Sequence, residues 1–365
     1  MTTTKRSVLV VGANGYIGLA VCRAFARAGW RVFGLVRRPE AASSLYAAEV
    51  TPLIGSLSDQ SLPQRLYSHT TTIDAIVGCA EPVDYSAYFQ QLTSLIRRVA
   101  ETSNKNGVRP LVLLSSGCKD YGTTDVDGAP GLAPHTETSP INPPAQLVAR
   151  AATSTGIFEL DDVVDAAVLR PTNVYGLGSS YYGLVFDYAS RVAAAGGAET
   201  LSIGSHPGSI MHALHVDDCA EAYVALAERA PREKVNGQCF NISASRYETT
   251  RDVLTALARE YKFPGGAVFR HELSAEARSG PDDDDGPALT GVFGFSQWVD
   301  SGKIRACTGW TEKKMLFSED LHVYRMAYEA ALASDGGETS AMRTKLEERW
   351  YQGNSTENKP TARYF

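Results

Sequence analysis

The feature that most constrains the fold of this chain lies near its start, in the stretch SVLVVGANGYIGLAVCRAFARAG. A run of apolar residues predicts a buried strand, and the spacing of apolar residues after the glycines predicts an amphipathic helix. Gly12, Gly15 and Gly18 stand between them. Gly12 permits a tight turn, Gly15 lets the backbone approach a pyrophosphate, and Gly18 lets the helix pack closely. In this context the motif predicts a dinucleotide-binding unit.

The residues around this turn specify the nucleotide further. Phosphates would lie at the helix N-terminus, where amide groups and the helix dipole favour anions. The second predicted strand runs into Arg37 and Arg38, at the position where NAD enzymes usually carry an acid for the ribose hydroxyl. Two guanidiniums suit a 2′-phosphate, so NADP(H) is the predicted cofactor. Further contacts to it are predicted from three residues of the turn, Asn14, Tyr16 and Ile17.

Strand-like and helix-length segments alternate through the first half of the chain, with strands expected in EVTPLIG, IDAIVGCA, RPLVLLSS and DAAVLRPT. This order predicts an α/β fold with a Rossmann-type, doubly wound parallel sheet. After Tyr175 we expect helices at 181–195, 217–230 and 249–261 with short strands between. The predicted division is an NADP-binding domain at 1–175 and a smaller mixed α/β substrate lobe at 176–365, with some segments returning to the sheet. The acidic stretch 279–291 is predicted to be a surface loop.

Composition narrows the classes of partner. The net charge is −6 without a basic stripe, which argues against nucleic acid. No apolar run has the length of a membrane span. The six cysteines are scattered without a CxxC pair, which predicts a reduced compartment and no metal site. A short polar tail leads directly into the first strand, so no secretory signal is expected. We therefore expect a cytoplasmic monomer or homodimer that binds a small molecule.

Several further motifs carry a family resemblance: GSLSD, GCAEP, LRPTNVYGLG, LHVDDCAEAYVALAE and QWVDSGKIRACTGW. Together with the glycine motif they resemble the extended short-chain dehydrogenase/reductase superfamily, of the NAD-dependent epimerase/dehydratase type, over nearly the whole chain. The resemblance implies that Leu57 flanks the adenine and that Cys79 and Ala80 line the nucleotide ribose. It also implies cofactor contacts near the nicotinamide from Pro171, Asn173 and Val174. Ser115 is a further predicted cofactor contact, because its strand delivers it to the carboxyl edge of the sheet, where ligands bind.

The superfamily's catalytic residues are missing. Gly117 occupies the position of the usual serine or threonine, and no Tyr-x-x-x-Lys occurs anywhere in the chain. In the segment that should carry this motif, one alignment replaces the pair by Gln146 and Arg150. The other alignment replaces it by Leu147 and Ala151. Neither provides a phenolic proton donor, so the standard mechanism is not encoded here.

A narrower resemblance concerns SSGCKDYG, which is similar to the Gly-x-Lys-x-Tyr segment of the progesterone 5β-reductase and iridoid synthase type. It implies that Lys119 is the catalytic lysine and Tyr121 the motif tyrosine, whereas the helix tyrosine of that type has no counterpart. A partly desolvated lysine beside NADP⁺ could donate a proton or stabilise an oxyanion. The alternative is that Lys119 only anchors the loop. Ser116, Arg150 and His212 are the other catalytic candidates.

The predicted substrate is an apolar small molecule. Nucleotide-sugar enzymes of the superfamily have an arginine in the segment that reads MHALHVDD here, and Met211 replaces it. Aromatic residues after 180 could form an apolar wall. The predicted substrate contacts are Glu81, Cys118, Tyr181, Tyr182 and Phe186. The alternatives are ordinary helix packing for the three aromatic residues and a small buried thiol for Cys118.

Three functions fit these observations. The first is NADPH-dependent reduction of a carbonyl or conjugated enone. The second is redox-neutral isomerase, cyclase or dehydratase chemistry with a structural cofactor. The third is a non-catalytic NADP(H) sensor. Because nucleotide binding supports all three equally, the first is favoured only by the loop that carries Lys119.

Overall fold

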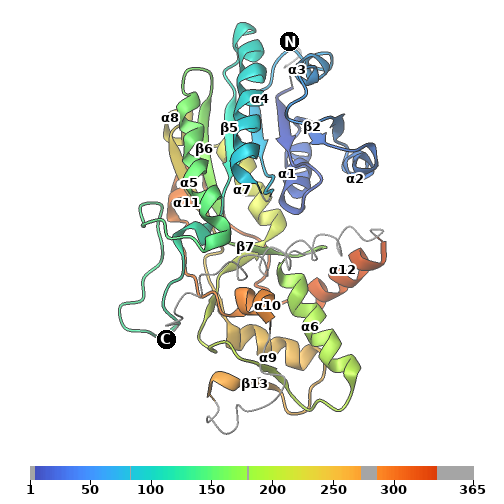
Figure 1. Cartoon of the computed structure of the whole chain (residues 1–365), viewed down its shortest axis with the longest axis vertical. Helices are drawn as coiled ribbons and strands as arrows, with labels where there is room; N and C mark the ends of the chain where they lie inside the picture. Colours follow the sequence, from blue (N-terminus) through green and yellow to red (C-terminus); the bar gives the residue numbers. More distant parts are fainter. Residues whose placement is uncertain (1–4, 83, 179–180, 273–285, 335–365) are drawn as a thin grey trace.

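The computed structural model describes residues 5–82, 84–178, 181–272 and 286–334, and it has two parts (Figure 1). The sheet domain occupies the upper half of the view, and a smaller lobe lies below it. The predicted fold class is confirmed, since seven parallel strands form one sheet in the order β11-β6-β5-β4-β1-β2-β3. The strands are β1 (Ser7–Val11), β2 (Arg31–Val36), β3 (Thr51–Ile54), β4 (Ala75–Gly78), β5 (Leu111–Ser115), β6 (Asp165–Pro171) and β11 (Gln238–Ile242).

Helices cover both faces of the sheet because the strand side chains alternate between two apolar clusters. Val8 and Val10 of β1 face one cluster, and Leu9 and Val11 face the other. The first face carries α1 (Tyr16–Arg27), α2 (Ser43–Ala47), α7 (Val216–Glu228), α8 (Arg232–Val235) and α11 (Gly302–Thr308). The second carries α3 (Leu62–Tyr67), α4 (Tyr85–Lys105) and the region of α5 (Val148–Thr153).

The strand order reverses between β1 and β4, and ligands of open α/β sheets bind outside the carboxyl ends of the strands at such a point. Short 3₁₀ turns shape the connections around the sheet. They are η1 (Pro39–Ala42), η2 (Cys118–Tyr121), η3 (Ala145–Leu147), η4 (Ser154–Leu160) and η5 (Arg270–Glu272). Of these, η2 follows β5 directly and so lies at this carboxyl edge.

The lobe combines short strand pairs with helices around an aromatic core. Tyr182 and Phe317 meet with ring centroids 4.6 Å apart at its centre. The strand pairs are β7 (Asn173–Tyr175) with β10 (Ala213–His215), β9 (Ile210–Met211) with β12 (Glu248–Thr249), and β8 (Leu201–Ile203) with β13 (Ala267–Phe269). The helices are α6 (Tyr181–Ala195), α9 (Thr250–Glu260), α10 (Gly286–Phe293) and α12 (Leu321–Ser334).

Helices α6, α7 and α9 confirm the three helices predicted after Tyr175. The loop predicted at 279–291 is wrong in its second half, where α10 forms because Leu289, Val292 and Phe293 bury into the lobe core. Its acidic half lies outside the described residues.

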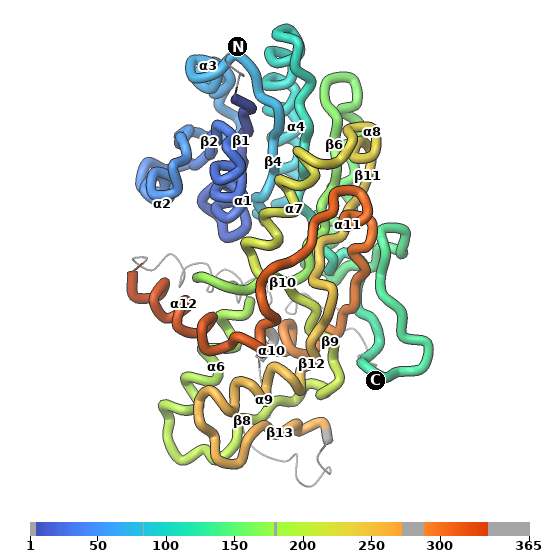
Figure 2. The backbone as a smooth tube through the Cα atoms, turned by 180° about the vertical axis from the view of Figure 1, so that it is seen from behind, coloured from blue at the N-terminus to red at the C-terminus, as the bar shows by residue number. Residues whose placement is uncertain are grey.

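The chain crosses between the two parts more than once. Segments α7, β11 and α11 follow Tyr175 in sequence, yet they lie against the sheet, and β11 pairs with β6 (Figure 2). A boundary at residue 175 therefore divides the sequence, but some segments that follow it still belong to the sheet domain. Within the described residues, no helix is both long and apolar enough to cross a membrane.

Candidate active site

The glycine turn forms a cradle for a dinucleotide. Gly12 has φ +78°, and a Cβ there would lie 2.8 Å from the Ala80 nitrogen. A Cβ on Gly18 would lie 2.0 Å from the Gly12 carbonyl oxygen, so only glycine lets α1 start this close to β1. A Cβ on Gly15, by contrast, would meet only the Gly12 carbonyl oxygen, at 3.1 Å. These residues fit a pyrophosphate at the N-terminus of α1.

The other predicted cofactor residues lie at or near the same edge. Arg37 and Arg38 are exposed directly after β2, and Leu57 is half-buried after β3. Asn14 belongs to the glycine turn, and Ile17 lies in the first turn of α1. Pro171 ends β6, and Asn173 and Val174 belong to β7. Further along this edge, Tyr16 donates to the Gly176 carbonyl at 2.5 Å.

Ser115 ends β5, Cys79 directly follows the neighbouring strand β4, and the two side chains contact each other. The Ser115 hydroxyl donates to Cys79 Sγ at 3.4 Å and is also hydrogen-bonded to the Tyr223 hydroxyl at 2.5 Å. Burial raises the pKa of the Cys79 thiol to about 12. These side chains therefore place neutral polar groups at the carboxyl edge of the sheet.

Lys119 lies on η2 and is buried, with 9% of its surface exposed. Its Nζ donates to the Gly291 carbonyl of α10 at 3.1 Å. The rings of Phe295 and Tyr181 lie 4.4 and 5.3 Å from Nζ. Burial and, to a smaller extent, the positive charge of Arg150 lower the pKa of Lys119 to about 7, while Glu81 opposes the shift. A lysine in this state exchanges protons near neutral pH.

A buried ionic network lies beside Lys119. Arg150 donates from Nη2 to Asp120 Oδ1 at 2.6 Å and from Nη1 to Glu81 Oε1 at 2.5 Å. Asp120 is fully buried and also accepts a short hydrogen bond from the Ser116 hydroxyl. The guanidinium of Arg170 approaches its other side, with Nε 3.9 Å from Oδ2. Asp120 therefore neutralises charge on two arginines, and this network fixes η2.

Arg150 explains why glycine stands at position 117. A Cβ on Gly117 would lie 3.0 Å from Arg150 Nη2. The guanidinium thus occupies the space next to the position where the superfamily has its hydroxyl residue. Of the two alignments left open by the sequence, the structure brings Arg150 of α5 into the site, whereas Leu147 and Ala151 are buried apolar positions.

The phenol ring of Tyr181, which comes from α6, lies next to Lys119, and the sequence does not predict this position. The sequence predicts it only as part of an apolar wall, yet its ring lies 5.3 Å from Lys119 Nζ. A search for Tyr-x-x-x-Lys assumes that both groups belong to one helix. Here they come from α6 and η2, so local spacing carries no signal for this pair.

Four predicted site residues have packing roles in the structure. Cys118 is fully buried and donates its thiol to the Arg170 carbonyl at 2.8 Å. His212 accepts at Nδ1 from the Val299 amide at 3.2 Å, so its Nε2 donates to the Ala244 carbonyl at 2.9 Å. Both ring nitrogens are engaged, and burial lowers the pKa of this histidine to about 4. The remaining two, in the lobe core, are Tyr182 and Phe186.

The placement of Tyr182 and Phe186 fits ordinary helix packing, because the lobe core takes up aromatic groups that the sequence alone makes available for a substrate wall. Cys118 fits the alternative of a small buried thiol. Tyr121 is likewise structural, since its hydroxyl donates to Asn241 Oδ1 at 2.8 Å and accepts from Arg170 at 2.9 Å.

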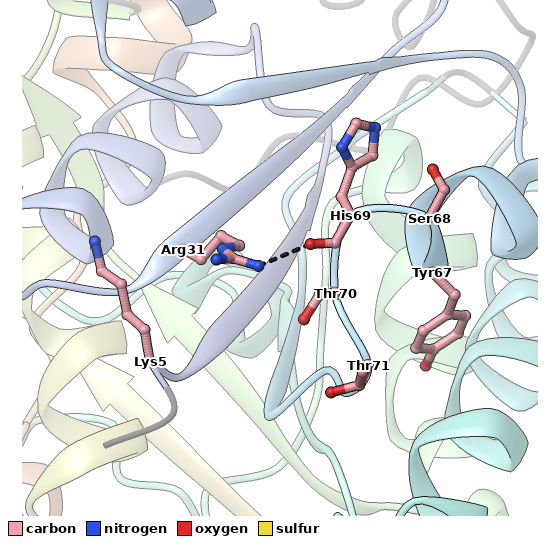
Figure 3. Close-up of a pocket in the computed structure, with 7 residues that line it drawn as sticks. All are labelled: Lys5, Arg31, Tyr67, Ser68, His69, Thr70 and Thr71. Atoms are coloured by element: carbon pink, nitrogen blue, oxygen red, sulfur yellow. Dashed lines mark hydrogen bonds between the residues drawn. The ribbon is translucent and has the colours of Figure 1, made fainter. Parts of the chain in front are cut away.

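A separate surface pocket of about 300 Å³ opens at the opposite, amino edge of the sheet. Figure 3 shows Lys5 and Arg31 on one side of it and the segment 67–71 on the other. Arg31 donates to the His69 carbonyl at 2.7 Å. None of the predicted site residues lines this pocket.

The parallel sheet, the glycine turn and the groups gathered at its carboxyl edge define a Rossmann-type nucleotide-dependent protein. The chain belongs to the NAD dependent epimerase/dehydratase family, whose sequence profile matches residues 8–243. An uncharacterized protein of Schizosaccharomyces pombe is 29% identical over 73% of this chain and 84% of its own length. The UDP-glucose 4-epimerase of Mycolicibacterium smegmatis is 28% identical over 47% of this chain and 53% of its own length.

Solved structures share the fold at low sequence identity. The UDP-glucose 4-epimerase of Thermotoga maritima, solved with UDP-glucose, superposes with a TM-score of 0.63 at 18% identity, covering 89% of this chain and 99% of that one. The dTDP-glucose 4,6-dehydratase of Bacillus anthracis, solved with NAD, gives 0.63 at 13% identity, covering 93% and 99%. A nicotinamide dinucleotide is the cofactor typical of this family.

Proposed function

We propose that this protein is an NADPH-dependent reductase that acts on a carbonyl or conjugated enone of an apolar small molecule. The observation that supports this most is Lys119, a buried lysine with a pKa of about 7 at the carboxyl edge of the sheet. NADPH would supply the hydride. Lys119 would donate a proton or hydrogen bond to the substrate oxygen as negative charge develops on it.

The surroundings of Lys119 suit this role. Phe295 and Tyr181 shield Nζ from water, and a less hydrated ammonium interacts more strongly with an oxyanion. Arg150 disfavours the charged form of the lysine, which makes its proton easier to give up. After donation, a proton from solvent restores the ammonium form. The residue therefore replaces the proton donor that the superfamily takes from its missing tyrosine.

The charge balance of the site favours an uncharged substrate. The positive charge of Arg150 is already balanced by the carboxylates of Asp120 and Glu81. Met211, at the position where nucleotide-sugar enzymes of the superfamily carry an arginine, is buried in β9 with 3% exposed. A nucleotide-sugar pyrophosphate would lack that cation here, and aromatic contacts around Lys119 favour apolar groups.

NADP(H) is proposed over NAD(H) because Arg37 and Arg38 are exposed immediately after β2. A guanidinium pair at the end of this strand suits the 2′-phosphate of NADP.

A redox-neutral reaction is the second candidate, and Glu81 favours it. This carboxylate has 38% of its side chain exposed beside the buried Arg150, so it could accept a proton while Lys119 donates one. Relatives named as an epimerase and a dehydratase add to this alternative.

One experiment separates the candidates. The protein and its Lys119→Met variant are incubated with NADPH and a panel of ketones, aldehydes and enones that includes 2-cyclohexen-1-one, and NADPH oxidation is compared with product formed. Equal amounts of NADPH oxidised and product formed, with both lost in Lys119→Met, would support the reductase. Product without net NADPH oxidation would favour the redox-neutral enzyme. Tight NADPH binding without turnover of any panel member would contradict both and leave a sensor.

A further inference from the structure

One side chain of the C-terminal region, Gln297, binds both ends of the turn that carries Lys119. Its amide nitrogen donates to the Cys118 carbonyl at 2.7 Å and to the Gly122 carbonyl at 2.7 Å. Cys118 directly precedes Lys119, and Gly122 caps the end of η2. Because both acceptors are carbonyl oxygens, the nitrogen of the amide and not its oxygen must face them. Both N–H groups of Gln297 are therefore used on this turn.

The turn has little support of its own. The Asp120 amide donates to the Gly117 carbonyl at 3.0 Å, and the Gly122 amide donates to the Lys119 carbonyl at 3.1 Å. Hydrogen bonds of a 3₁₀ turn have poorer geometry than those of an α-helix, so contacts from outside the turn have a large share in fixing its shape. Gln297 supplies two such contacts.

Gln297 is itself fixed by its neighbours. Its side chain is buried, with 6% of the residue exposed, and its backbone amide donates to the Ile210 carbonyl of β9 at 3.0 Å. The preceding hydroxyl, Ser296 Oγ, accepts from the Ile210 amide at 3.0 Å and donates to the Asp125 carbonyl at 2.9 Å. The Thr124 amide donates to the Ser296 carbonyl at 2.8 Å. Gln297 thus connects η2 to a strand of the lobe.

The same stretch of chain contacts the ammonium group of Lys119. Gly291 accepts the hydrogen bond from Nζ at 3.1 Å, and the Phe295 ring lies 4.4 Å from Nζ. Residues 291–297 therefore contact both the side chain of Lys119 and the backbone on either side of it. A shift of η2 relative to this stretch would move Nζ away from these partners. Misplacing a reacting group by about 1 Å can cost about a hundredfold in rate.

We propose that Gln297 is a positioning residue that fixes the backbone of η2 so that Lys119 Nζ meets the carbonyl oxygen of the substrate. Gln297 acts through the carbonyls of Cys118 and Gly122 and not on the reacting atoms. The inference rests on the proposed function, because it needs a reaction that Lys119 serves.

The test uses Gln297→Met in the full chain, since methionine keeps the length of the side chain and removes both donors. In NADPH-dependent reduction of 2-cyclohexen-1-one we expect kcat to fall about tenfold or more. The affinity for NADPH should not change, because the glycine turn lies elsewhere.

A second readout follows Lys119 itself and needs no turnover. Lysine labelled with ¹³C at Cε gives a resonance for Lys119, assigned by its absence from Lys119→Met, and its pH titration is recorded by NMR. In Gln297→Met we expect the titration to move from about 7 toward the ordinary value, because a loosened turn lets water reach Nζ. The decline of kcat above neutral pH should move to higher pH with it.

Thr308→Val is the matched control. Thr308 of α11 is also buried, its hydroxyl donates to the Ile304 carbonyl at 2.7 Å, and it accepts from the Trp310 amide at 3.0 Å. The control therefore also removes two hydrogen bonds to backbone groups. It should lower thermal stability as Gln297→Met does, with the kcat and the Lys119 titration of the parent.

Gln297→Glu provides a milder variant in case Gln297→Met does not fold. Two facing carbonyl oxygens favour the protonated carboxyl, which keeps the shape of the amide and one of its two donors. Its kcat and Lys119 titration should lie between those of the parent and Gln297→Met.

Parent-like kcat and Lys119 titration in the folded Gln297 variants would overturn the inference, while loss of activity in Lys119→Met would still support the proposed function. Lower stability with an unchanged Lys119 titration would also overturn it, because Gln297 would then serve the fold alone. A parent protein that reduces no carbonyl would overturn the proposed function, and a shifted titration in Gln297→Met but not in Thr308→Val would still support control of Lys119 by Gln297.

Discussion

The two halves of the carboxyl edge of the sheet differ in how they are built. Around Gly12 and Gly18 the site consists of backbone, and a single Cβ at Gly18 would lie 2.0 Å from a carbonyl oxygen. Around β5 the site consists of side chains, and the nearest atom to a Cβ at Gly117 would belong to the Arg150 guanidinium, at 3.0 Å. Backbone geometry leaves little freedom, so the first region keeps the family pattern. Side chains can be replaced by a different combination of residues, and Gly117, Lys119 and Arg150 form one such combination.

The difference teaches that cofactor binding and chemistry are separable in this fold. The glycine turn offers a dinucleotide amide groups and a helix N-terminus, which do not depend on the reaction. The reaction depends on groups whose charge and pKa are set by burial and neighbours. Variants in the two regions should therefore have different consequences, in the following order of size.

Asp120→Asn should have the largest effect, on stability. The fully buried carboxylate lies between Arg150 and Arg170, and removing its charge leaves two buried guanidiniums poorly compensated. We expect a loss of about 3–5 kcal/mol in the free energy of unfolding, measured by urea denaturation. Asp162→Asn, which breaks the exposed pair with Arg97, is the control and should change stability far less. Equal effects of the two variants would show that the network does not stabilise the β5 region.

Lys119→Ala should have the next largest effect, on catalysis. We expect kcat for carbonyl reduction to fall about a hundredfold or more, because a donor to the developing oxyanion is lost. Lys119→Arg should not restore activity fully, since a guanidinium does not give up a proton near neutral pH. NADPH affinity should hardly change, because the glycine turn binds the phosphates. Lys105→Ala, at the exposed end of α4, is the control. Parent-like kcat in Lys119→Ala would leave the lysine as a loop anchor.

Arg37→Asp should affect only the nucleotide-binding half. Loss of a charge-assisted contact to the 2′-phosphate should cost about 1.5–3 kcal/mol of NADPH binding, roughly a tenfold to hundredfold weaker affinity. Affinity for NADH should change little. Fluorescence titration of both cofactors measures this, and equal affinities of the parent protein for the two would refute the predicted preference.

The smallest effect concerns pH. The pKa of Lys119 is lowered from 10.5 to about 7, so the proton-donating form falls about tenfold for each pH unit above that value. We expect kcat to decline above neutral pH with this slope, and the decline to be absent from the residual rate of Lys119→Met. Between the two pKa values the unfolded chain holds more protons than the folded one, so this residue makes folding more favourable as pH rises. A flat profile would argue against Lys119 as the donor.

The fold was predictable because its signals are local. The run from Ser7 to Gly29 specifies strand, turn and helix, and the alternation that follows specifies a parallel sheet, as the structure confirms. The loop prediction at 279–291 failed because charge dominated its composition, while the apolar spacing of Leu289, Val292 and Phe293 was enough to form α10.

The site was predictable only in part. Lys119 follows directly from a motif on β5, and its selection as the catalytic candidate stays a prediction. His212 and Cys118 were given roles from residue type alone, and their polar atoms are used by backbone partners that sequence does not reveal.

The sequence by itself determined the dinucleotide turn, the class of fold and the absence of the family's Tyr-x-x-x-Lys. Only the tertiary structure decided that Arg150, and not its alignment alternatives, enters the site, and that α5, α6 and η2 contribute to one cluster around Lys119. The physical reason is that a turn is set by the steric needs of neighbouring residues, whereas a lysine's pKa is set by burial and by charges that arrive from distant parts of the chain.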